Sequence, residues 1–127
     1  MGRVILIVED DPKTVKLLRD LLQIRGYTTF EATDGKQGVD MARAKMPDLI
    51  FMDMQMPVMD GFEAINILKA DPVTKGIPVV ALTALAMQGD REKCMEAGFN
   101  DYITKPLDTR AFMIKVNEYL EKQGKSP

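Results

Sequence analysis

Five short runs of apolar residues recur along the chain. They occupy residues 4–8, 27–32, 48–53, 78–82 and 100–104. Bounded runs of about four to eight residues that are rich in β-branched and aromatic side chains are typical of buried strands. We therefore predict a strand at each of these positions.

Helical periodicity fills the interval after each run. In the first interval, Asp11 followed by Pro12 is typical of an N-cap and the first helical position, and Gly26 marks the end of the helix. In the second interval, a helix begins after Asp34 and ends at Pro47. The apolar residues predicted to face the core are Val15, Leu17, Leu18, Leu21, Leu22 and Ile24 in the first helix and Val39, Ala42 and Met46 in the second.

Similar signals bound three further helices. The third begins after a loop that contains Pro57 and Gly61 and ends at Asp71, and the fourth covers residues 89–97 and stops at Gly98. A fifth helix follows the last strand. The residues predicted to face the core are Phe62, Ile65 and Leu68 in the third helix and Phe112, Val116, Tyr119 and Leu120 in the fifth.

This alternation of strands and helices predicts an α/β fold with a parallel sheet covered on both faces. Two doubly wound strand orders are plausible. The flavodoxin-like order 2-1-3-4-5 brings Asp10, after the first strand, close to Asp53, at the end of the third. We predict a (βα)5 sandwich with this order, as one domain over residues 1–122 followed by a short polar tail over residues 123–127.

Composition narrows the classes of function that the protein could have. The 127 residues are 46% hydrophobic, which is enough for one core, and the net charge of -2 offers nucleic acid or anionic lipid no broad attraction. There is neither a signal-peptide pattern nor an apolar stretch of the roughly 20 residues that span a bilayer. We expect a cytoplasmic protein without direct nucleic-acid contacts or membrane insertion. The single cysteine, Cys94, excludes an internal disulfide, and the absence of histidine predicts that any metal is held by oxygen.

Chemically distinctive residues stand at the ends of three predicted strands. Glu9 and Asp10 follow the first, Asp53 ends the third, and Lys105 follows the fifth. Side chains at the carboxyl ends of parallel strands meet at one edge of the sheet, where a bound Mg²⁺ would relieve the repulsion between carboxylates. Asp11 is better interpreted as a helix cap than as a metal ligand.

Asp53 has the setting of a nucleophile. A carboxylate can attack phosphorus and form an acyl phosphate when a metal and a cation neutralise the phosphoryl oxygens. Thr83, at the end of the fourth strand, can donate a hydrogen bond to such an oxygen. Lys105 lies two strands from Asp53, so it would have to reach across roughly 10 Å, part of which the phosphoryl group would fill. The bond between Lys105 and Pro106 is a candidate for the cis form, and the sequence does not fix the isomer.

These motifs resemble the receiver domain of bacterial two-component response regulators over essentially the whole chain. The residues that carry the resemblance are Glu9-Asp10, Asp53 with MPVMDG behind it, Thr83-Ala84 and Lys105-Pro106. The resemblance implies a chemotaxis-regulator-like single-domain protein. Such a protein accepts a phosphoryl group from a phosphohistidine of a sensor histidine kinase or a histidine phosphotransfer protein, with Mg²⁺ required. It catalyses that transfer and its own dephosphorylation.

The resemblance also assigns roles to individual residues. Mg²⁺ would be bound by Asp10, Asp53 and the backbone carbonyl of Gln55, with Glu9 in the outer shell. The phosphoryl oxygens would be held by Thr83, the amide of Ala84 and Lys105. Tyr102 would rotate as Thr83 moves toward the phosphate, which changes the face of the fourth helix, fifth strand and fifth helix. Gln55 and Leu85 occupy the two positions that tune the lifetime of the phosphorylated state.

The resemblance further implies partners. The histidine-bearing protein would dock on the first turn of the first helix and around Pro106 and Leu107, and a downstream protein target would bind the switching face. The chain is expected to be a monomer or a weak phosphorylation-dependent dimer. Its start at Met1 favours a free single-domain regulator over a phosphorelay intermediate or an excised receiver.

Two other classes of function compete with this interpretation. A magnesium-dependent phosphatase with an aspartyl nucleophile would need a second aspartate two residues after Asp53, where Gln55 stands, and a cap domain. A flavodoxin-like redox protein would need an anion-binding loop after the first strand, where the sequence is Glu-Asp-Asp-Pro. Both are disfavoured by these residues.

Overall fold

A five-stranded parallel sheet forms the centre of the computed structural model, which describes residues 3–84 and 89–121. The strand order is β2-β1-β3-β4-β5, so the predicted order is confirmed. The strands are β1 (Val4–Val8), β2 (Thr28–Ala32), β3 (Leu49–Asp53), β4 (Val79–Thr83) and β5 (Asp101–Thr104). Every pairing between neighbouring strands is parallel, so all five strands end at the same edge of the sheet.

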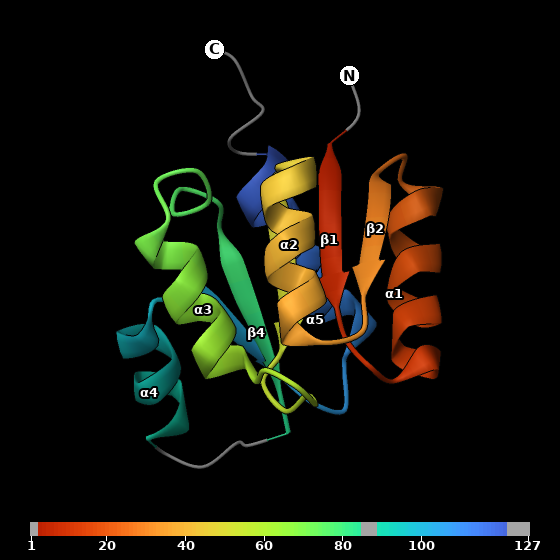
Figure 1. Ribbon diagram of the computed structural model, residues 1–127. Coiled ribbons are helices and arrows are strands. Elements are labelled where there is room, and N and C mark those ends of the chain that lie inside the picture. Colours follow the sequence, from red (N-terminus) through yellow and green to blue (C-terminus); the bar gives the residue numbers. More distant parts are fainter. Residues whose placement is uncertain (1–2, 85–88, 122–127) are drawn as a thin grey trace.

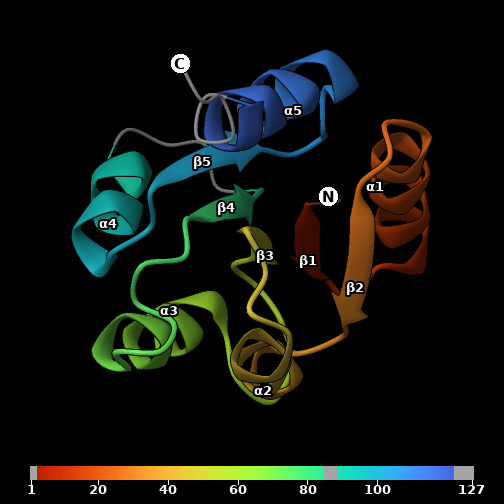
Figure 2. The same cartoon turned by 90° about the horizontal axis from the view of Figure 1, so that it is seen from above.

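Helices cover both faces of this sheet. The helices are α1 (Pro12–Ile24), α2 (Gly35–Lys45), α3 (Gly61–Ala70), α4 (Asp90–Ala97) and α5 (Thr109–Val116), followed by a π-helical turn η1 (Asn117–Glu121). Figure 2 shows α1 and α5 on one side of the sheet and α2 and α3 on the other. Helix α4 lies near the edge formed by β5. The doubly wound sandwich is therefore confirmed.

The helices begin and end at the predicted signals. The side chain of Asp11 caps α1 by accepting a hydrogen bond from the amide of Lys13, so the interpretation of Asp11 as a cap is confirmed. Asp60 and Glu63 form a reciprocal capping box at the start of α3. Gly98 ends α4 in the left-handed conformation, which glycine adopts without steric cost.

Two hydrophobic clusters fill the space between the sheet and its helices. Side chains that alternate along β3 belong to different clusters: Ile50 and Met52 pack toward α2 and α3, and Leu49 and Phe51 pack toward α1 and α5. The ring of Phe51 lies 4.5 Å from that of Phe112, measured between centroids. Because both faces of β3 are covered, its five residues are all buried.

Three predicted core residues lie at the surface. On α1, Leu17 is 42% exposed and Ile24 is 82% exposed, because only the stripe with Val15, Leu18 and Leu22 faces the sheet. Met46 is 49% exposed and lies beyond the end of α2 with a φ of 47°. The following proline disfavours the right-handed helical conformation at this position, so the helix stops one residue earlier than predicted.

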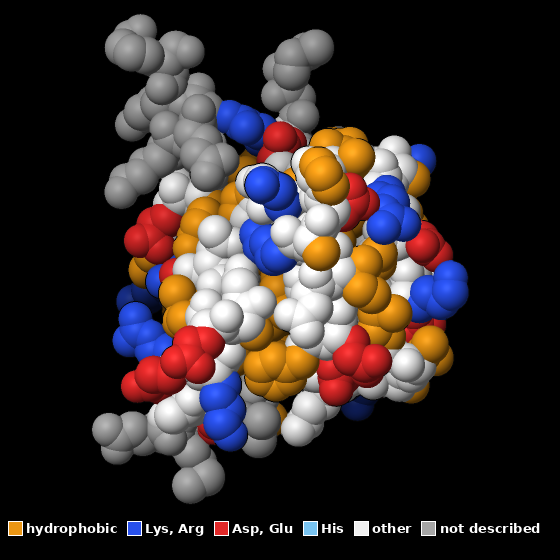
Figure 3. Space-filling model, turned by 60° about the vertical axis from the view of Figure 1, so that its left-hand side comes forward, with side chains coloured by type: hydrophobic (Ala, Val, Ile, Leu, Met, Phe, Trp, Pro, Cys, Tyr) orange, Lys and Arg blue, Asp and Glu red, His pale blue; other side chains and the backbone are white. Residues whose placement is uncertain are grey.

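The surface carries both signs of charge. Among the described residues visible in Figure 3, acidic and basic side chains are interspersed, so this face has no broad field of one sign. None of the helices within residues 3–84 and 89–121 is long and apolar enough to cross a membrane.

Lys69 ties the end of α3 to the loops before β4 and β5. Its Nζ donates hydrogen bonds to the backbone oxygens of Lys75 (3.2 Å) and Ile77 (3.0 Å) and to Oδ1 of Asn100 (3.3 Å). These acceptors are neutral, and burial lowers the pKa of Lys69. One side chain therefore joins the segment before β4 to the segment before β5, which are separated in sequence by α4.

Replacing this lysine tests its structural role. We expect Lys69→Met to lower the free energy of unfolding by about 1–2 kcal/mol, because the bonded acceptors lose a charged donor. Lys75→Met removes an exposed lysine nearby and is expected to change stability by less than about 0.5 kcal/mol. Urea titrations of both variants measure the difference, and equal stabilities would show that the Lys69 bonds contribute nothing net.

Candidate functional site

The candidate site lies where β1, β3 and β5 end, at the lower edge of the sheet in Figure 1. The register between β1 and β3 pairs Val8 with Met52, so Glu9, directly after β1, and Asp53, the last residue of β3, lie side by side. Asp10 follows as the first exposed residue after β1. The predicted convergence of these carboxylates at one edge of the sheet is thus present in the structure.

The three carboxylates form a compact acidic cluster. One oxygen from each of Glu9, Asp10 and Asp53 lies within 4.8 Å of the others. Glu9 is fully buried and Asp53 is 5% exposed, whereas Asp10 is exposed. The amide of Gln55 donates to Oδ1 of Asp53 over 3.1 Å, which orients that carboxylate. A cluster of hard oxygen donors with one open side has the chemistry of a Mg²⁺ site.

Lys105 contacts two of these carboxylates. Its Nζ lies 2.9 Å from Oε1 of Glu9 and 3.1 Å from Oδ2 of Asp53. Burial opposes the lysine charge, but hydrogen bonds to the two carboxylates outweigh it and raise the pKa of Lys105. The sequence predicted a gap filled by a phosphoryl group, whereas here the lysine reaches Asp53 directly. The peptide bond between Lys105 and Pro106 is cis.

Glu9 has an unusual protonation equilibrium. Burial raises the pKa of Glu9 from 4.5 to about 7, against the lowering effect of its bond to Lys105, and the nearby Asp53 raises it further. A glutamate in this state is partly protonated near neutral pH. Removing the proton adds a negative charge to a cluster that already holds Asp53.

This equilibrium predicts a pH dependence of stability in the metal-free protein. The folded state binds a proton more tightly than the unfolded state, so the contribution of Glu9 is fully present below pH 4.5 and is lost as the pH rises to about 7. We expect the free energy of unfolding to fall by about 1–3 kcal/mol more in the parent than in Glu9→Gln over this window.

Urea titrations in EDTA at several pH values measure this difference. Glu92→Gln, at an exposed position of α4, is the matched control and should keep the parental pH dependence. If Glu9→Gln shows the same fall in stability as the parent, Glu9 is not the titrating group.

Thr83 and Tyr102 lie on neighbouring strands near the cluster. Thr83 ends β4 and is 2% exposed, and the exposed Ala84 follows it. Tyr102 is half-buried on β5, opposite Ala81. The guanidinium of Arg91 on α4 lies 6.0 Å from the centre of the Tyr102 ring. Leu85, a predicted lifetime position, lies outside the described residues.

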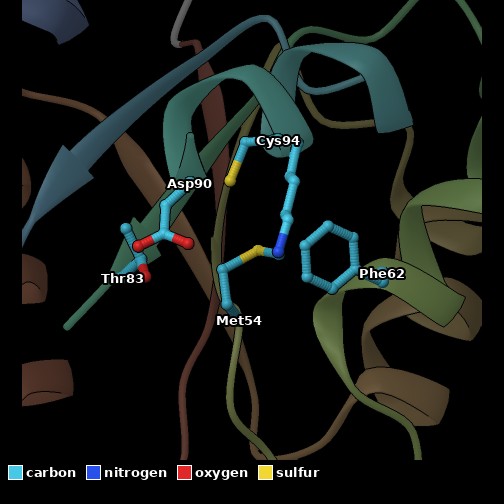
Figure 4. Close-up of a pocket in the computed structure, with 6 residues that line it drawn as sticks. Met54, Phe62, Thr83, Asp90 and Cys94 are labelled. Carbon is cyan, nitrogen blue, oxygen red and sulfur yellow. The ribbon is translucent and has the colours of Figure 1, made fainter. Parts of the chain in front are cut away.

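A cavity of about 100 Å³ lies next to Thr83, between α3 and α4. Its lining residues are Met54, Phe62, Thr83, Asp90, Lys93 and Cys94. In Figure 4 the carboxylate of Asp90 lies beside Thr83, and the sulfur of Cys94 points into the cavity. Burial, with the charge of Asp90, raises the pKa of the Cys94 thiol, so Cys94 has the environment of a packing residue and not that of a reactive thiol.

Residues 5–117 match the family described as the response regulator receiver domain. The chain belongs to this family. As a receiver domain it is a phosphoryl-accepting module of two-component signalling.

Several relatives of this receiver are known. It is 41% identical to the polar-differentiation response regulator DivK of Brucella anthropi over 120 residues, which are 94% of this chain and 98% of that protein. The receiver domain of a sensor histidine kinase from Pseudomonas aeruginosa PAO1, solved with a magnesium ion in the active site cleft, is 37% identical with a TM-score of 0.85. That alignment covers 94% of this chain and 98% of the other.

A chain in a co-crystal structure is also similar. The crystal contains the Saccharomyces cerevisiae histidine phosphotransfer protein Ypd1 and the receiver domain of its downstream response regulator Ssk1. The identity is 31% and the TM-score 0.90, with 96% of this chain and 91% of that chain covered. These relatives favour the receiver interpretation over the phosphatase and redox alternatives.

Sequence reasoning missed two contacts around the receiver site. A Cβ on Gly35 would collide with the backbone oxygen of Met59, so the start of α2 packs directly on the loop after Asp53. From the sequence, Asp34 and Gly35 indicated only the start of a helix. The contact between Arg91 and Tyr102 joins residues from two elements and has no local sequence signal.

Proposed function

We propose that this receiver is a phosphorylation-dependent switch in which Asp53 accepts the phosphoryl group. The observation that carries the proposal is the contact of Lys105 with Asp53 beside an acidic cluster. A metabolic phosphatase needs a general acid near the nucleophile, and the residue two positions after Asp53 is Gln55. A nucleophile with a cation and metal ligands, but without that acid, suits a phosphoenzyme that persists long enough to signal.

Mg²⁺ is the metal that the donor set fits. Asp10, Asp53 and the backbone carbonyl of Gln55 would bind it, and Glu9 would act from the outer shell. When bound, Mg²⁺ neutralises phosphoryl oxygens and so lowers the barrier to attack by an anion. The receiver domain from Pseudomonas aeruginosa with a coordinated magnesium ion supports this assignment by analogy.

In the proposed transfer, a carboxylate oxygen of Asp53 attacks phosphorus in line with the nitrogen of a phosphohistidine. The phosphorus–oxygen bond forms as the phosphorus–nitrogen bond breaks, and the imidazole leaves with the electron pair and takes up a proton. Lys105 keeps its charge next to the phosphoryl oxygens. The hydroxyl of Thr83 and the amide of Ala84 donate to the same group, and water later hydrolyses the acyl phosphate.

The switch follows from new hydrogen bonds to the phosphoryl group. Thr83 moves toward it, Tyr102 turns inward, and the surface of α4, β5 and α5 changes. The histidine donor would be a sensor kinase or a phosphotransfer protein, in line with the Ypd1 and Ssk1 co-crystal. A downstream protein would bind the changed surface, with the receiver as a monomer or a weak dimer. We place this activity in the cytoplasm.

The proposal is tested by mixing the receiver with a phosphorylated histidine phosphotransfer domain. With Mg²⁺ we expect one phosphoryl group per receiver, and the label should be released by hydroxylamine, as an acyl phosphate is. EDTA should slow the transfer by at least about 100-fold, because the phosphoryl charge is then opposed by Lys105 alone. Equal labelling in EDTA, or repeated release of phosphate from small metabolites, would contradict the proposed function.

A further inference from the structure

The loop after Asp53 contains a strained turn. Val58 has a φ of 68°, and within residues 3–84 and 89–121 the other non-glycine residue with a positive φ is Met46, at the end of α2. A β-branched side chain in the left-handed region is strained, because it crowds the backbone. Val58 is 76% exposed and belongs to neither hydrophobic cluster of the described residues. Its own side chain therefore does not offset the strain.

Neighbouring residues must hold this turn, since strained backbone persists only where its surroundings impose it. Met56 and Met59, on either side of Val58, are half-buried and pack against the hydrophobic cluster that contains the buried residues of α2 and α3. The amide of Met59 donates to the backbone oxygen of Pro57 over 2.7 Å, which closes the turn. The backbone oxygen of Met59 lies against Gly35 at the start of α2. The two thioether side chains are therefore anchors of the turn.

Both anchors can be reached by an oxidant. A hydroperoxide oxidises a thioether by forming a sulfur–oxygen bond as its own oxygen–oxygen bond breaks, which gives a sulfoxide and releases water or an alcohol. Met56 and Met59 are partly open to solvent, whereas Met52 and Met54 are 0% and 4% exposed. A sulfoxide is polar, so burying it in an apolar cluster without a hydrogen-bond partner is unfavourable. Oxidation therefore weakens the packing that holds the turn.

We propose that Met56 and Met59 form an oxidation-sensitive switch that turns off phosphoryl acceptance at Asp53. Loss of both anchors lets Val58 relax to a negative φ, and the loop then moves away from Asp53. The contact that this movement breaks is the hydrogen bond from the amide of Gln55 to Oδ1 of Asp53, over 3.1 Å. Reduction of the sulfoxides restores the turn. The inference rests on the proposed function, because it takes Asp53 as the acceptor.

The first test follows loop opening in the metal-free protein and does not involve phosphoryl transfer. The amide of Gly61 donates to the backbone oxygen of Met54 over 3.1 Å, across the base of the loop. Treatment with hydrogen peroxide should accelerate hydrogen exchange at this amide by about tenfold or more. In the double variant Met56→Leu with Met59→Leu, peroxide should leave the exchange rate unchanged, because leucine is similar in volume and is not oxidised. Unchanged exchange in the oxidised parent would overturn the inference.

The second test measures transfer from a phosphorylated histidine phosphotransfer domain before and after peroxide treatment. We expect peroxide to slow transfer to the parent by about tenfold or more, and transfer to the Met56→Leu, Met59→Leu variant by less than about twofold. The matched control is Met46→Leu with Met95→Leu, which removes two exposed methionines outside the loop and should remain as sensitive as the parent. Equal inactivation of the two double variants would show that other residues are responsible.

Enzymatic repair identifies the oxidised group. Methionine sulfoxide reductases A and B, supplied with dithiothreitol, should return the oxidised parent to within about twofold of its initial transfer rate, whereas dithiothreitol alone should not. Recovery with dithiothreitol alone would assign the effect to the thiol of Cys94 and overturn the role of the methionines.

The contribution of strain is tested with Val58→Asn, because asparagine tolerates the left-handed conformation. The oxidised variant should keep its turn, so its loss of transfer after peroxide should be smaller than that of the parent by about threefold or more. Val73→Asn is the matched control, since Val73 is an exposed valine whose φ is not positive, and it should be inactivated like the parent. Equal inactivation of Val58→Asn and the parent would overturn strain release as the cause.

Failure of the inference and failure of the proposed function give different results. If the unoxidised parent does not accept phosphate in a Mg²⁺-dependent manner, the proposed function is wrong. If it does, and the oxidised parent accepts phosphate at the same rate, the phosphorylation site stands and only the oxidation switch is wrong.

Discussion

Replacing Asp53 by asparagine is expected to reduce phosphoryl transfer by at least about 100-fold, because the amide oxygen is a much weaker nucleophile than the carboxylate. The side chain keeps its size, so the fold should be retained. Removing the charge of a 5% exposed residue next to Glu9 also relieves repulsion, and we expect the metal-free variant to be at least as stable as the parent. Radiolabelled phosphotransfer measures the first effect, and urea titration the second.

The matched control is Asp11→Asn, the same substitution at the residue that directly follows Asp10 of the acidic cluster. Asp11 caps α1, and asparagine is an equally good cap, so both stability and transfer should stay close to those of the parent. Transfer to Asp53→Asn at the parental rate would show that another residue accepts the phosphoryl group. Loss of transfer in both variants would indicate that the site is sensitive to any change near the cluster. It would not identify Asp53 as the nucleophile.

Replacing Lys105 by methionine is expected to separate metal binding from catalysis. The variant loses the cation that lies 3.1 Å from Asp53, so the transferred phosphoryl group is less well stabilised and transfer should slow by about 100-fold or more. The same change leaves the carboxylates with less compensating charge, so Mg²⁺ should bind more tightly than in the parent. Single-turnover transfer at saturating Mg²⁺ and a direct Mg²⁺ titration measure the two effects.

Lys36→Met serves as the control, because Lys36 is exposed on α2 and, among the residues that the structure describes, its ion pair is with Asp40 on its own helix. It should change neither quantity by more than about twofold. Weaker Mg²⁺ binding in Lys105→Met would mean that the lysine organises the carboxylates for the metal. An unchanged transfer rate would show that Lys105 does not contribute to phosphoryl transfer.

The topology and the carboxylate cluster could be predicted because they follow from local patterns. Five apolar runs that alternate with helical segments predict a parallel sheet, and the 2-1-3-4-5 order then brings Asp10 and Asp53 together. Asp11 was recognisable as a cap because capping depends on the residues that follow it directly. In each case the deciding interactions are local or are set by strand adjacency.

The remaining features depend on side-chain reach and packing across elements. The contact of Lys105 with Glu9 joins residues 96 positions apart and requires the register of all the intervening strands. Burial of Glu9, and hence its raised pKa, depends on what covers the end of β1. The exposure of Leu17 and Ile24 depends on the width of the face that α1 buries, which apolar periodicity overestimates.

The distance along the chain between Lys105 and its partners also constrains when the protein becomes competent during synthesis. Asp10 and Asp53 are translated in the first half of the chain, whereas Lys105 follows Asp53 by 52 positions and is held by the backbone of Thr83. A domain generally folds as a unit, so the acidic cluster and the lysine come together only after β5 has been synthesised. We therefore expect a nascent receiver to be silent until β5 has joined the sheet, which protects the signalling pathway from partly made copies that compete for phosphate.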